Sequence, residues 1–223
     1  MLPDVLDRDM MIVPGPRRFC RTSSEILKVT GVGLTLLDGS RLFGQVGASD
    51  DIAVGLEWAE FALGEGPRAV AAVTREPVLD PDMVDAVDRY PLFAPVARAL
   101  GANAIFTFPV GSTSSVIATL SLYNDASGDL SRDQLVRASL LARTAFAIIR
   151  VAMSTCADGE IPDELSHVGK DRDGVHQATG MISAQLDVSM ADALGALRAH
   201  AWATNEPLAE VSAAVIERRL RLD

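Results

Sequence analysis

Three short amphipathic segments in the last quarter of the chain, residues 166–223, constrain the fold most. In the first segment, apolar residues recur at steps of three and four and so share one helical face: Val175, Ala178, Met181, Ile182 and Leu186. Ser189 followed three residues later by Asp192 has the pattern of a capping box, which predicts a second helix from Ser189. Asn205 and then Pro207 indicate the start of a third helix. The sequence therefore predicts a compact three-helix unit.

The apolar faces of the second and third predicted helices leave little room for enzyme chemistry. The second helix is predicted to bury Ala193, Leu194, Leu197 and Ala201 and to present Asp192, Arg198 and also Trp202 elsewhere. The third is predicted to bury Leu208, Val211, Val215 and Ile216 and to end in Arg218, Arg219 and Arg221. We interpret this unit as an output module that the upstream part of the chain controls.

The composition favours a protein of two domains in the cytoplasm. At 223 residues, the chain has room for one domain of about 150 residues and a smaller second one. Charges interrupt every apolar stretch before it reaches the roughly 20 residues needed to cross a bilayer, and no signal peptide is evident. Cys20 and Cys156 are too few for a disulfide scaffold or a four-ligand zinc site, so we expect each to be a buried or idle thiol.

The upstream part mixes helices with antiparallel strands. Strands at 32–37 and 41–46 flank Asp38-Gly39-Ser40, a sequence typical of a tight hairpin turn. Further strands are predicted at 77–79, 104–110 and 116–123, and helices at 17–29, 50–66 and 92–100. The fold class is therefore α+β, with an antiparallel sheet flanked by helices.

A long helix is predicted from Ser131, capped by Gln134, to the neighbourhood of Cys156. Its wider apolar strip consists of Leu135, Ala138, Ala142, Ala145, Ile149 and Ala152, and we assign it to the protein's own sheet. Its narrower strip consists of Val136, Leu140, Ala147 and Val151, beside a line of Arg132, Arg143 and Arg150. The narrower strip is expected to pack on a second helix, either the N-terminal one or its copy in a dimer. The alternative is a helix buried within one monomer.

The predicted output module resembles the ANTAR family, RNA-binding transcription antitermination regulators of bacteria. The resemblance covers about fifty residues: Val175 to Ile182 (VHQATGMI), Asp192-Ala193, Leu197-Arg198, Ala201, and Asn205 to Val211. It implies a module that binds tandem stem-loops in nascent RNA as a dimer. Two positions depart from the family, which usually has Lys at Thr179 and Ala at Ser212.

The charge of the module requires RNA to bind at a local basic patch. Residues 166–223 hold six basic and eight acidic side chains, a net charge of −2 within a chain of −10, while phosphate contacts supply much of the affinity of such proteins. We expect RNA to contact Lys170, Arg172, Gln177, Thr179, Arg198, His200 and Asn205. Arg218, Arg219 and Arg221 are either further contacts or solvated charges.

The upstream part resembles the GAF domains found ahead of ANTAR modules in actinobacteria. The motifs are Leu63 to Pro67 (LGEGP), Pro77-Val78 with Asp80, Tyr90 to Phe93 (YPLF), Phe106 to Pro109 (FTFP), and Leu122-Tyr123. Many relatives have Cys after the LGEGP motif, where this chain has Arg68. The resulting division is a lead-in at 1–16, a GAF-like sensor at 17–153, a linker at 154–166 and an ANTAR-like domain at 167–223.

The resemblance implies a sensory pocket between the sheet and its covering helices, for an unknown small-molecule or protein signal. We nominate Phe43, Trp58, Phe61, Phe93, Phe106, Phe108 and Tyr123 as its lining, although most of these also suit a plain core. All three histidines lie outside the predicted sensor, and no cofactor or metal is expected. Asp80, Asp82, Asp85 and Asp88 are expected to form a solvated acidic loop, with a bound cation as the alternative.

Together, these features predict a homodimeric, signal-responsive RNA-binding antitermination regulator. No Ser-His-Asp grouping, metal cluster or phosphate-binding loop supports catalysis, so an enzyme is not expected. The alternative is a signalling protein whose helical C-terminus docks a protein partner, which Thr179 and the charge of −2 favour.

Overall fold

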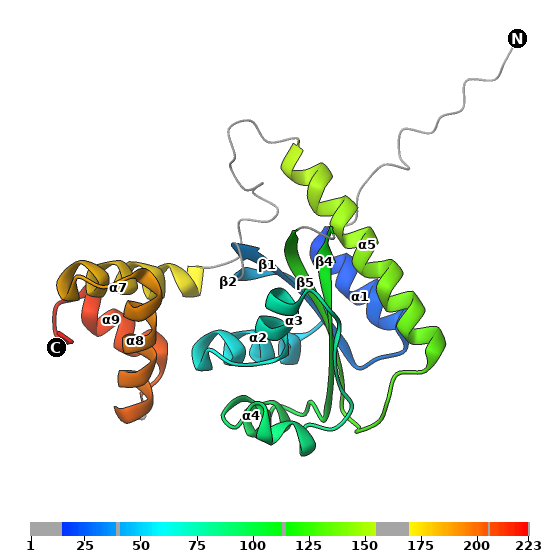
Figure 1. The fold of residues 1–223 in the computed structure, drawn as a ribbon, viewed down its shortest axis with the longest axis horizontal. Coiled ribbons are helices and arrows are strands. Elements are labelled where there is room, and N and C mark those ends of the chain that lie inside the picture. The colour runs from blue at the N-terminus through cyan, green and yellow to red at the C-terminus, as the bar shows by residue number, and fades with distance from the viewer. Residues whose placement is uncertain (1–14, 39–40, 113–114, 155–169, 205, 223) are drawn as a thin grey trace, which may run out of the picture.

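A five-stranded antiparallel sheet forms the centre of the larger domain (Figure 1). The computed structural model describes residues 15–38, 41–112, 115–154, 170–204 and 206–222. The strands are β1 (Gly31–Asp38), β2 (Arg41–Ala48), β3 (Val78–Asp80), β4 (Ala104–Gly111) and β5 (Val116–Asn124), in the order β2-β1-β5-β4-β3. Each neighbouring pair runs antiparallel. The predicted hairpin at 32–46 is confirmed by the pairing of β1 with β2.

Helices α1 (Pro16–Leu27) and α5 (Arg132–Ser154) pack on one face of the sheet. Side chains alternate between the two faces of a strand, so this face receives Leu34 of β1, Phe106 of β4 and Leu120 of β5. The predicted cap of α5 is confirmed: the Ser131 backbone amide donates to Gln134 Oε1 over 2.9 Å, and the Gln134 amide donates to Ser131 Oγ over 3.3 Å. The Gln134 side-chain amide also donates to the Leu27 carbonyl, which ties the start of α5 to the end of α1.

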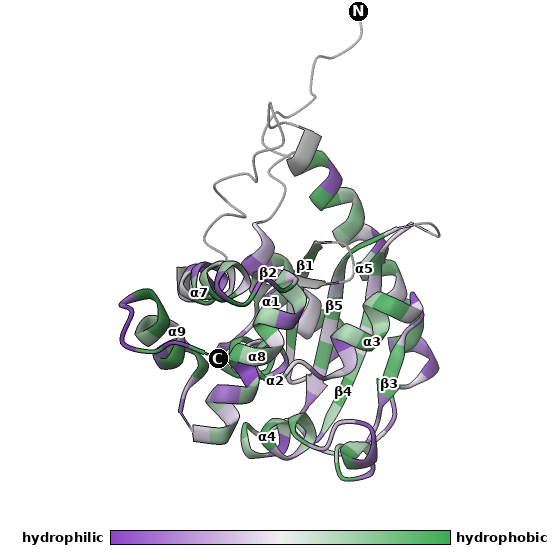
Figure 2. Cartoon of the chain, turned by 60° about the vertical axis from the view of Figure 1, so that its left-hand side comes forward, coloured by the Kyte–Doolittle hydropathy of each residue, from purple (hydrophilic) through white to green (hydrophobic). Residues whose placement is uncertain are grey.

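The two apolar strips of α5 have different environments. In the wider strip, Ala138, Ala142, Ala145 and Ile149 are buried against the sheet, as predicted. In the narrower strip, the side chains of Val136, Leu140 and Val151 are 55%, 54% and 51% exposed. Green segments alternate with purple ones along α5 in Figure 2. Among the described residues, neither α1 nor another element buries Val136 and Leu140 of the narrower strip.

Helices α2 (Asp51–Leu63), α3 (Pro67–Thr74) and α4 (Phe93–Ala99), with the 3₁₀ turn η2 (Asp85–Asp88), lie on the other face of the sheet. The sequence predicted one helix over 50–66 and did not predict α3. Gly64 ends α2 with a φ of +73°, and Gly66, with a φ of +147°, has no room for a Cβ beside Glu60. Pro67 at the first turn of α3 favours a new helix there.

The acidic loop is less exposed to solvent than the sequence predicted. Asp80 is fully buried and pairs with Arg89, while Asp85 and Asp88 are exposed. The expectation of a solvated loop is therefore wrong for Asp80. Cys20 is also fully buried, and burial raises the pKa of its thiol to about 12. Cys156 lies outside the described residues.

The C-terminal unit consists of α7 (Lys170–Leu186), α8 (Met190–Thr204) and α9 (Leu208–Ile216), as predicted. The cap at α8 is present, since the Asp192 amide donates to Ser189 Oγ over 3.1 Å. Its core contains Val175, Ile182, Leu197, Val211 and Val215, all 3% exposed or less. Among the described residues, no helix combines the length and apolarity that a membrane span requires.

Candidate nucleic-acid interface

The outer side of α2 is where the larger domain meets the three-helix domain (Figure 1). The Arg172 guanidinium, at the start of α7, pairs with the Glu57 carboxylate on α2. The two side chains are 3% and 5% exposed. A buried pair of this kind replaces the hydration of both charges, so removing either partner leaves an uncompensated charge in the interface.

Phe61 of α2 enters the core of the three-helix domain. It is 2% exposed and clusters with the buried residues of α7, α8 and α9. Its ring is flanked by two cations, with the guanidinium carbon of Arg172 at 3.9 Å from the ring centroid and that of Arg198 at 5.4 Å. The negative faces of aromatic rings attract such cations. Trp58, one turn earlier on α2, lies beside Phe61 with ring centroids 5.6 Å apart.

Arg198 of α8 sits on the C-terminal end of α2. Its Nη2 donates to the backbone carbonyl of Phe61 in the last turn of that helix, and a Cβ built on Gly64 would lie 3.0 Å from its Nη1. A helix C-terminus carries partial negative charge, so a cation is favourable there. The sequence predicted an open position for Arg198, and that prediction is wrong: tertiary packing places this side chain against the larger domain.

The two arginines are held by unequal sets of partners. Burial and, to a smaller extent, the nearby positive charge of Arg172 lower the pKa of Arg198 to about 10. Arg198 Nε is buried without a hydrogen-bond partner among the described residues. Arg172 has the Glu57 carboxylate to offset its own burial. The contact therefore combines one well-matched ion pair with one cation that is only partly satisfied.

The inner side of α2 carries a second buried ion pair. The Glu60 carboxylate accepts from the Arg68 backbone amide over 3.0 Å and from Arg68 Nη1 over 2.7 Å. Arg68 is 2% exposed and Glu60 is 1% exposed. Burial raises the pKa of Glu60 to about 7, although the Arg68 charge opposes that shift. Glu57 and Glu60 are one turn apart, so α2 links the interior of the sensor with the three-helix domain.

A polar layer lies on the sheet face beneath α2 and α3. Thr35, Thr107, Thr119 and Ser121 are all buried, on the strand positions that alternate with the apolar cluster beneath α1 and α5. Thr107 and Ser121 share a hydrogen bond of 3.0 Å. Buried Thr35 Oγ1, Thr119 Oγ1 and Arg68 Nε lack partners among the described residues. Unpaired buried polar atoms are unfavourable, so the hydrogen-bonding capacity of these three atoms is unused among the described residues.

The residues nominated for RNA contact fall into separate environments. Arg172 and Arg198 contact the sensor, and Thr179 is 3% exposed with its hydroxyl donating to the Val175 carbonyl over 2.6 Å. Gln177 is exposed and His200 is half-buried. The Lys170 side chain and Asn205 lie outside the described residues. Arg218, Arg219 and Arg221 are exposed at the end of the domain.

The nominated pocket aromatics do not line one cavity, so that prediction is wrong as a single site. Phe106 and Phe108 belong to the core beneath α1 and α5, and Phe93 and Tyr123 to the core beneath α2 and α4. Trp58 and Phe61 form the contact between the domains. The Phe43 side chain lies outside the described residues. A cavity of about 830 Å³ opens elsewhere, between the starts of α1 and α2 and the end of β2.

Sequence reasoning missed Glu57, Glu60 and Arg68, which organise this site. A signal for two of them was present, because Glu57 and Glu60 interrupt the mostly apolar stretch of α2 after its first turn, and a buried carboxylate requires a partner. The LGEGP motif has a structural role: Glu65 Oε1 accepts the backbone amides of Leu92 and Phe93 over 2.6 and 2.8 Å and so caps α4.

Comparison with solved structures gives the class of the larger domain. The GAF domain from an Acinetobacter phosphoenolpyruvate-protein phosphotransferase is similar, with a TM-score of 0.50 and 17% identity over 64% of this chain and 84% of that chain. A GAF domain/HD domain protein from Geobacter sulfurreducens has a TM-score of 0.48 and 10% identity, covering 60% and 88% of the two chains. The cyanobacteriochrome TePixJ GAF domain has a TM-score of 0.47 and 16% identity, covering 61% and 87%. The larger domain has the GAF fold.

The smaller domain is identified by its sequence. Residues 163–216 match the family described as the ANTAR domain. No curated protein matches the chain. The chain thus joins a domain of GAF fold to an ANTAR domain, a combination that indicates a signalling regulator.

Proposed function

We propose that this protein is an RNA-binding transcription antitermination regulator whose GAF-fold domain controls its ANTAR domain. The observation that carries the proposal is the ANTAR match at residues 163–216. The basic residues of this domain lie on α7, on α8 and after α9. The target is a tandem stem-loop in nascent RNA, bound by a dimer in the cytoplasm. The activity is binding rather than catalysis.

The proposed signal acts on the polar layer beneath α2 and α3. In this layer and on Arg68, three buried polar atoms lack partners among the described residues: Arg68 Nε and the hydroxyl oxygens of Thr35 and Thr119. A polar ligand that hydrogen-bonds these atoms changes the environment of the Glu60–Arg68 pair, and α2 transmits the change to Glu57 and Phe61. A signal shifts an equilibrium only through different affinity for its two states. Control by a ligand therefore requires two positions of α2 with different affinities for it.

A direct test measures RNA binding by the intact protein. The probes are a pool of tandem stem-loop RNAs with randomised loops and a single-stranded RNA pool of the same length, titrated by fluorescence anisotropy at two salt concentrations. We expect tighter binding to the tandem stem-loops and a steep loss of affinity with salt, because bound cations displace counterions from phosphates. Equal affinity for both pools, with or without conditions that promote a dimer, would contradict the proposal.

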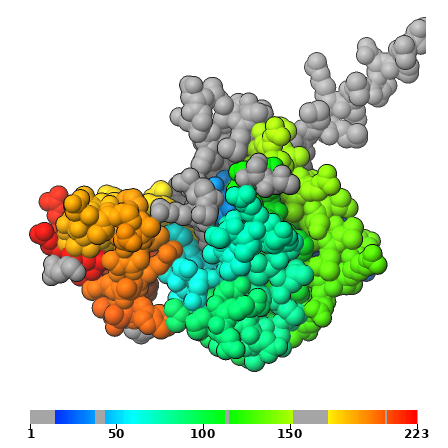
Figure 3. Space-filling view, in the orientation of Figure 1, coloured from blue at the N-terminus to red at the C-terminus, as the bar shows by residue number. Residues whose placement is uncertain are grey.

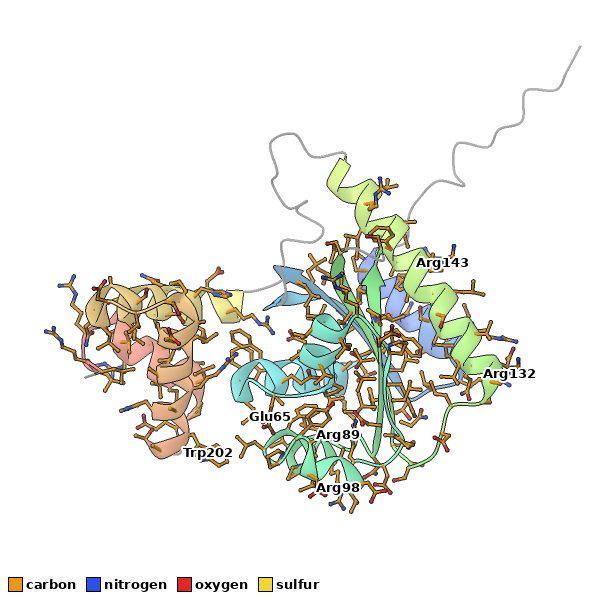
Figure 4. All side chains as sticks on the ribbon, in the orientation of Figure 1. Glu65, Arg89, Arg98, Arg132, Arg143 and Trp202 are labelled. Carbon is orange, nitrogen blue, oxygen red and sulfur yellow. The ribbon has the colours of Figure 1, made fainter. Side chains whose placement is uncertain are left out.

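The second candidate function is docking of a protein partner by the C-terminal helices. Burial of Thr179 and the net charge of −2 favour it, together with the exposed Trp202, which is 64% exposed and lies at the far end of α8 in Figure 4. Aromatic side chains are common anchors in protein interfaces. Partner binding that changes little with salt, combined with no preference for the tandem RNA, would support this candidate.

A further inference from the structure

The outer side of α2 binds the same two arginines that the proposed function assigns to RNA. Arg172 meets the Glu57 carboxylate, and Arg198 meets the Phe61 carbonyl and the C-terminal end of α2. In Figure 3 the yellow and orange residues of the ANTAR domain lie directly against the cyan residues of this part of the sensor. Each guanidinium is thus occupied by groups that replace a phosphate: a carboxylate for one, and the negative end of a helix dipole for the other.

We propose that this contact is autoinhibitory: the outer side of α2, formed by Glu57, Trp58 and Phe61, competes with RNA for Arg172 and Arg198. The inference rests on the proposed function, since it assigns regulation to the same RNA-binding residues. In the docked arrangement, the exposed arginines of the ANTAR domain among the described side chains are Arg218, Arg219 and Arg221, all near the end of the chain. RNA gains access to Arg172 and Arg198 only when α7 and α8 leave α2.

The contact is suited to reversible release because it is not uniformly favourable. Phe61 and the Glu57–Arg172 pair hold the domains together, whereas Arg198 is only partly buried and its buried Nε has no partner among the described residues, close to the second cation. Two like charges beside one aromatic ring repel each other. An RNA phosphate relieves this repulsion, so RNA and α2 are mutually exclusive ligands of the same two side chains. By linkage, RNA then weakens docking by the same factor by which docking weakens RNA binding.

The test is a charge reversal within the full-length protein. Glu57→Arg places a cation opposite Arg172 and is expected to release the ANTAR domain. Glu76→Arg is the matched control, because Glu76 is exposed on the sensor beyond α3 and gives the same change in net charge. RNA affinity is measured with the same tandem stem-loop pool. Both variants carry Trp202→Phe, which leaves Trp58, partly buried beside Phe61, as the one tryptophan and so as a fluorescence reporter of docking.

We expect Glu57→Arg to bind RNA at least about tenfold more tightly than Glu76→Arg, since apparent affinity rises with the fraction of competent molecules. Trp58 emission should shift to longer wavelength in Glu57→Arg, and RNA should produce the same shift in the control. If circular dichroism shows that Glu57→Arg is unfolded, Glu57→Gln, which keeps the side-chain size, takes its place with the same expectation.

The outcomes separate this inference from the proposed function. Equal RNA affinity of the Glu57 variant and the Glu76 control, with both preferring the tandem RNA, would overturn autoinhibition and leave the regulator intact. Tighter RNA binding without a change in Trp58 emission would also overturn it, because release of α2 would not be the cause. Failure of every variant, including those with a released domain, to prefer tandem RNA would overturn the proposed function itself.

Discussion

At the scale of single residues, each buried charged side chain around α2 has a specific partner. Glu60 and Arg68 are buried together, and Glu57 and Arg172 are buried together, so that four charges lie out of solvent around one helix. Arg198 has a helix end and a ring instead of a carboxylate among its described partners. Burial of an arginine thus coincides with a specific partner on α2 in each case. That coincidence makes single substitutions informative.

Arg198→Ala tests the role of this residue in RNA binding. We expect a loss of affinity of about 1 to 3 kcal/mol if the guanidinium contacts a base, or a salt slope smaller by about one if it contacts phosphate. Filter binding at several salt concentrations measures both. Arg98→Ala is the matched control, because Arg98 is an exposed arginine on α4 of the sensor (Figure 4). Affinity of Arg198→Ala equal to that of this control would remove Arg198 from the RNA site.

Glu60→Gln tests the ion pair inside the sensor through pH. The pKa of Glu60 is raised to about 7 from an ordinary 4.5, so the folded state binds its proton more tightly than the unfolded state does. The stability that this proton contributes is complete below pH 4.5 and is lost as pH rises through about 7. We therefore expect the free energy of unfolding of wild type to fall across this range more steeply than that of Glu60→Gln. Urea denaturation at pH 5 and pH 8 measures both slopes, and identical slopes would contradict the assignment.

At the scale of elements, α5 and α2 have complementary roles. The wider apolar strip of α5 packs on the sheet. In the narrower strip, which forms the outer side of α5, Val136 and Leu140 are exposed, and Arg132 and Arg143 project from the side away from the sheet (Figure 4). Helix α2 instead connects the sensor interior to the ANTAR domain. Among the described residues, α2 carries the buried contacts with the ANTAR domain. We therefore propose α2 for control and α5 for association of two chains.

Leu140→Glu tests the outer strip of α5 as a dimer contact. Two copies of the strip would bury Val136, Leu140 and Val151, so a carboxylate at Leu140 is expected to convert a dimer into a monomer at micromolar concentration. Ser139→Glu adds the same charge at an exposed position on the flank of the strip and should leave the dimer unchanged. Sedimentation velocity of the two variants decides. A dimer in both would place the contact elsewhere.

At the scale of the whole molecule, the layered arrangement sets what each face can do. The sheet separates an apolar core beneath α1 and α5 from a mixed polar core beneath α2, α3 and α4. The narrower strip of α5 lies on the outer side of the first core, and the contact with the ANTAR domain lies on the outer side of the second. The proposed dimer contact and the ANTAR contact therefore lie on opposite sides of one domain, so a dimer through α5 would be compatible with docking in the same molecule.

Sizing of a shortened chain tests this separation. A chain that ends at residue 153 keeps the sheet and nearly all of α5 but lacks the ANTAR domain. We expect it to be a dimer, like the intact protein, because the outer strip of α5 remains. Light scattering coupled to size exclusion gives both masses. Monomers in both cases would remove α5 as a dimer contact, and a dimer of the intact protein alone would assign the contact to the ANTAR domain.

The sequence by itself determined the elements whose patterns are local. The three C-terminal helices, the hairpin and both serine caps follow from spacing within about ten residues, where a helix or strand period and a capping hydroxyl act on neighbouring atoms. The short helix α3 was missed, because Gly66 and Pro67 are typical of a helix end as well as of a new start.

Only the tertiary structure decided which side chains meet. Phe61 and Arg198 are 137 residues apart, and the apolar periodicity of α2 and α8 does not indicate that Arg198 binds the C-terminal end of α2. The expected aromatic pocket was divided among three cores for the same reason, since strand alternation sends Phe106 and Tyr123 to opposite faces of the sheet. Local hydrogen-bond geometry fixes each element, but burial of a charge depends on the partner that folding brings to it. The availability of the two arginines proposed to bind RNA is therefore a property of the assembled chain.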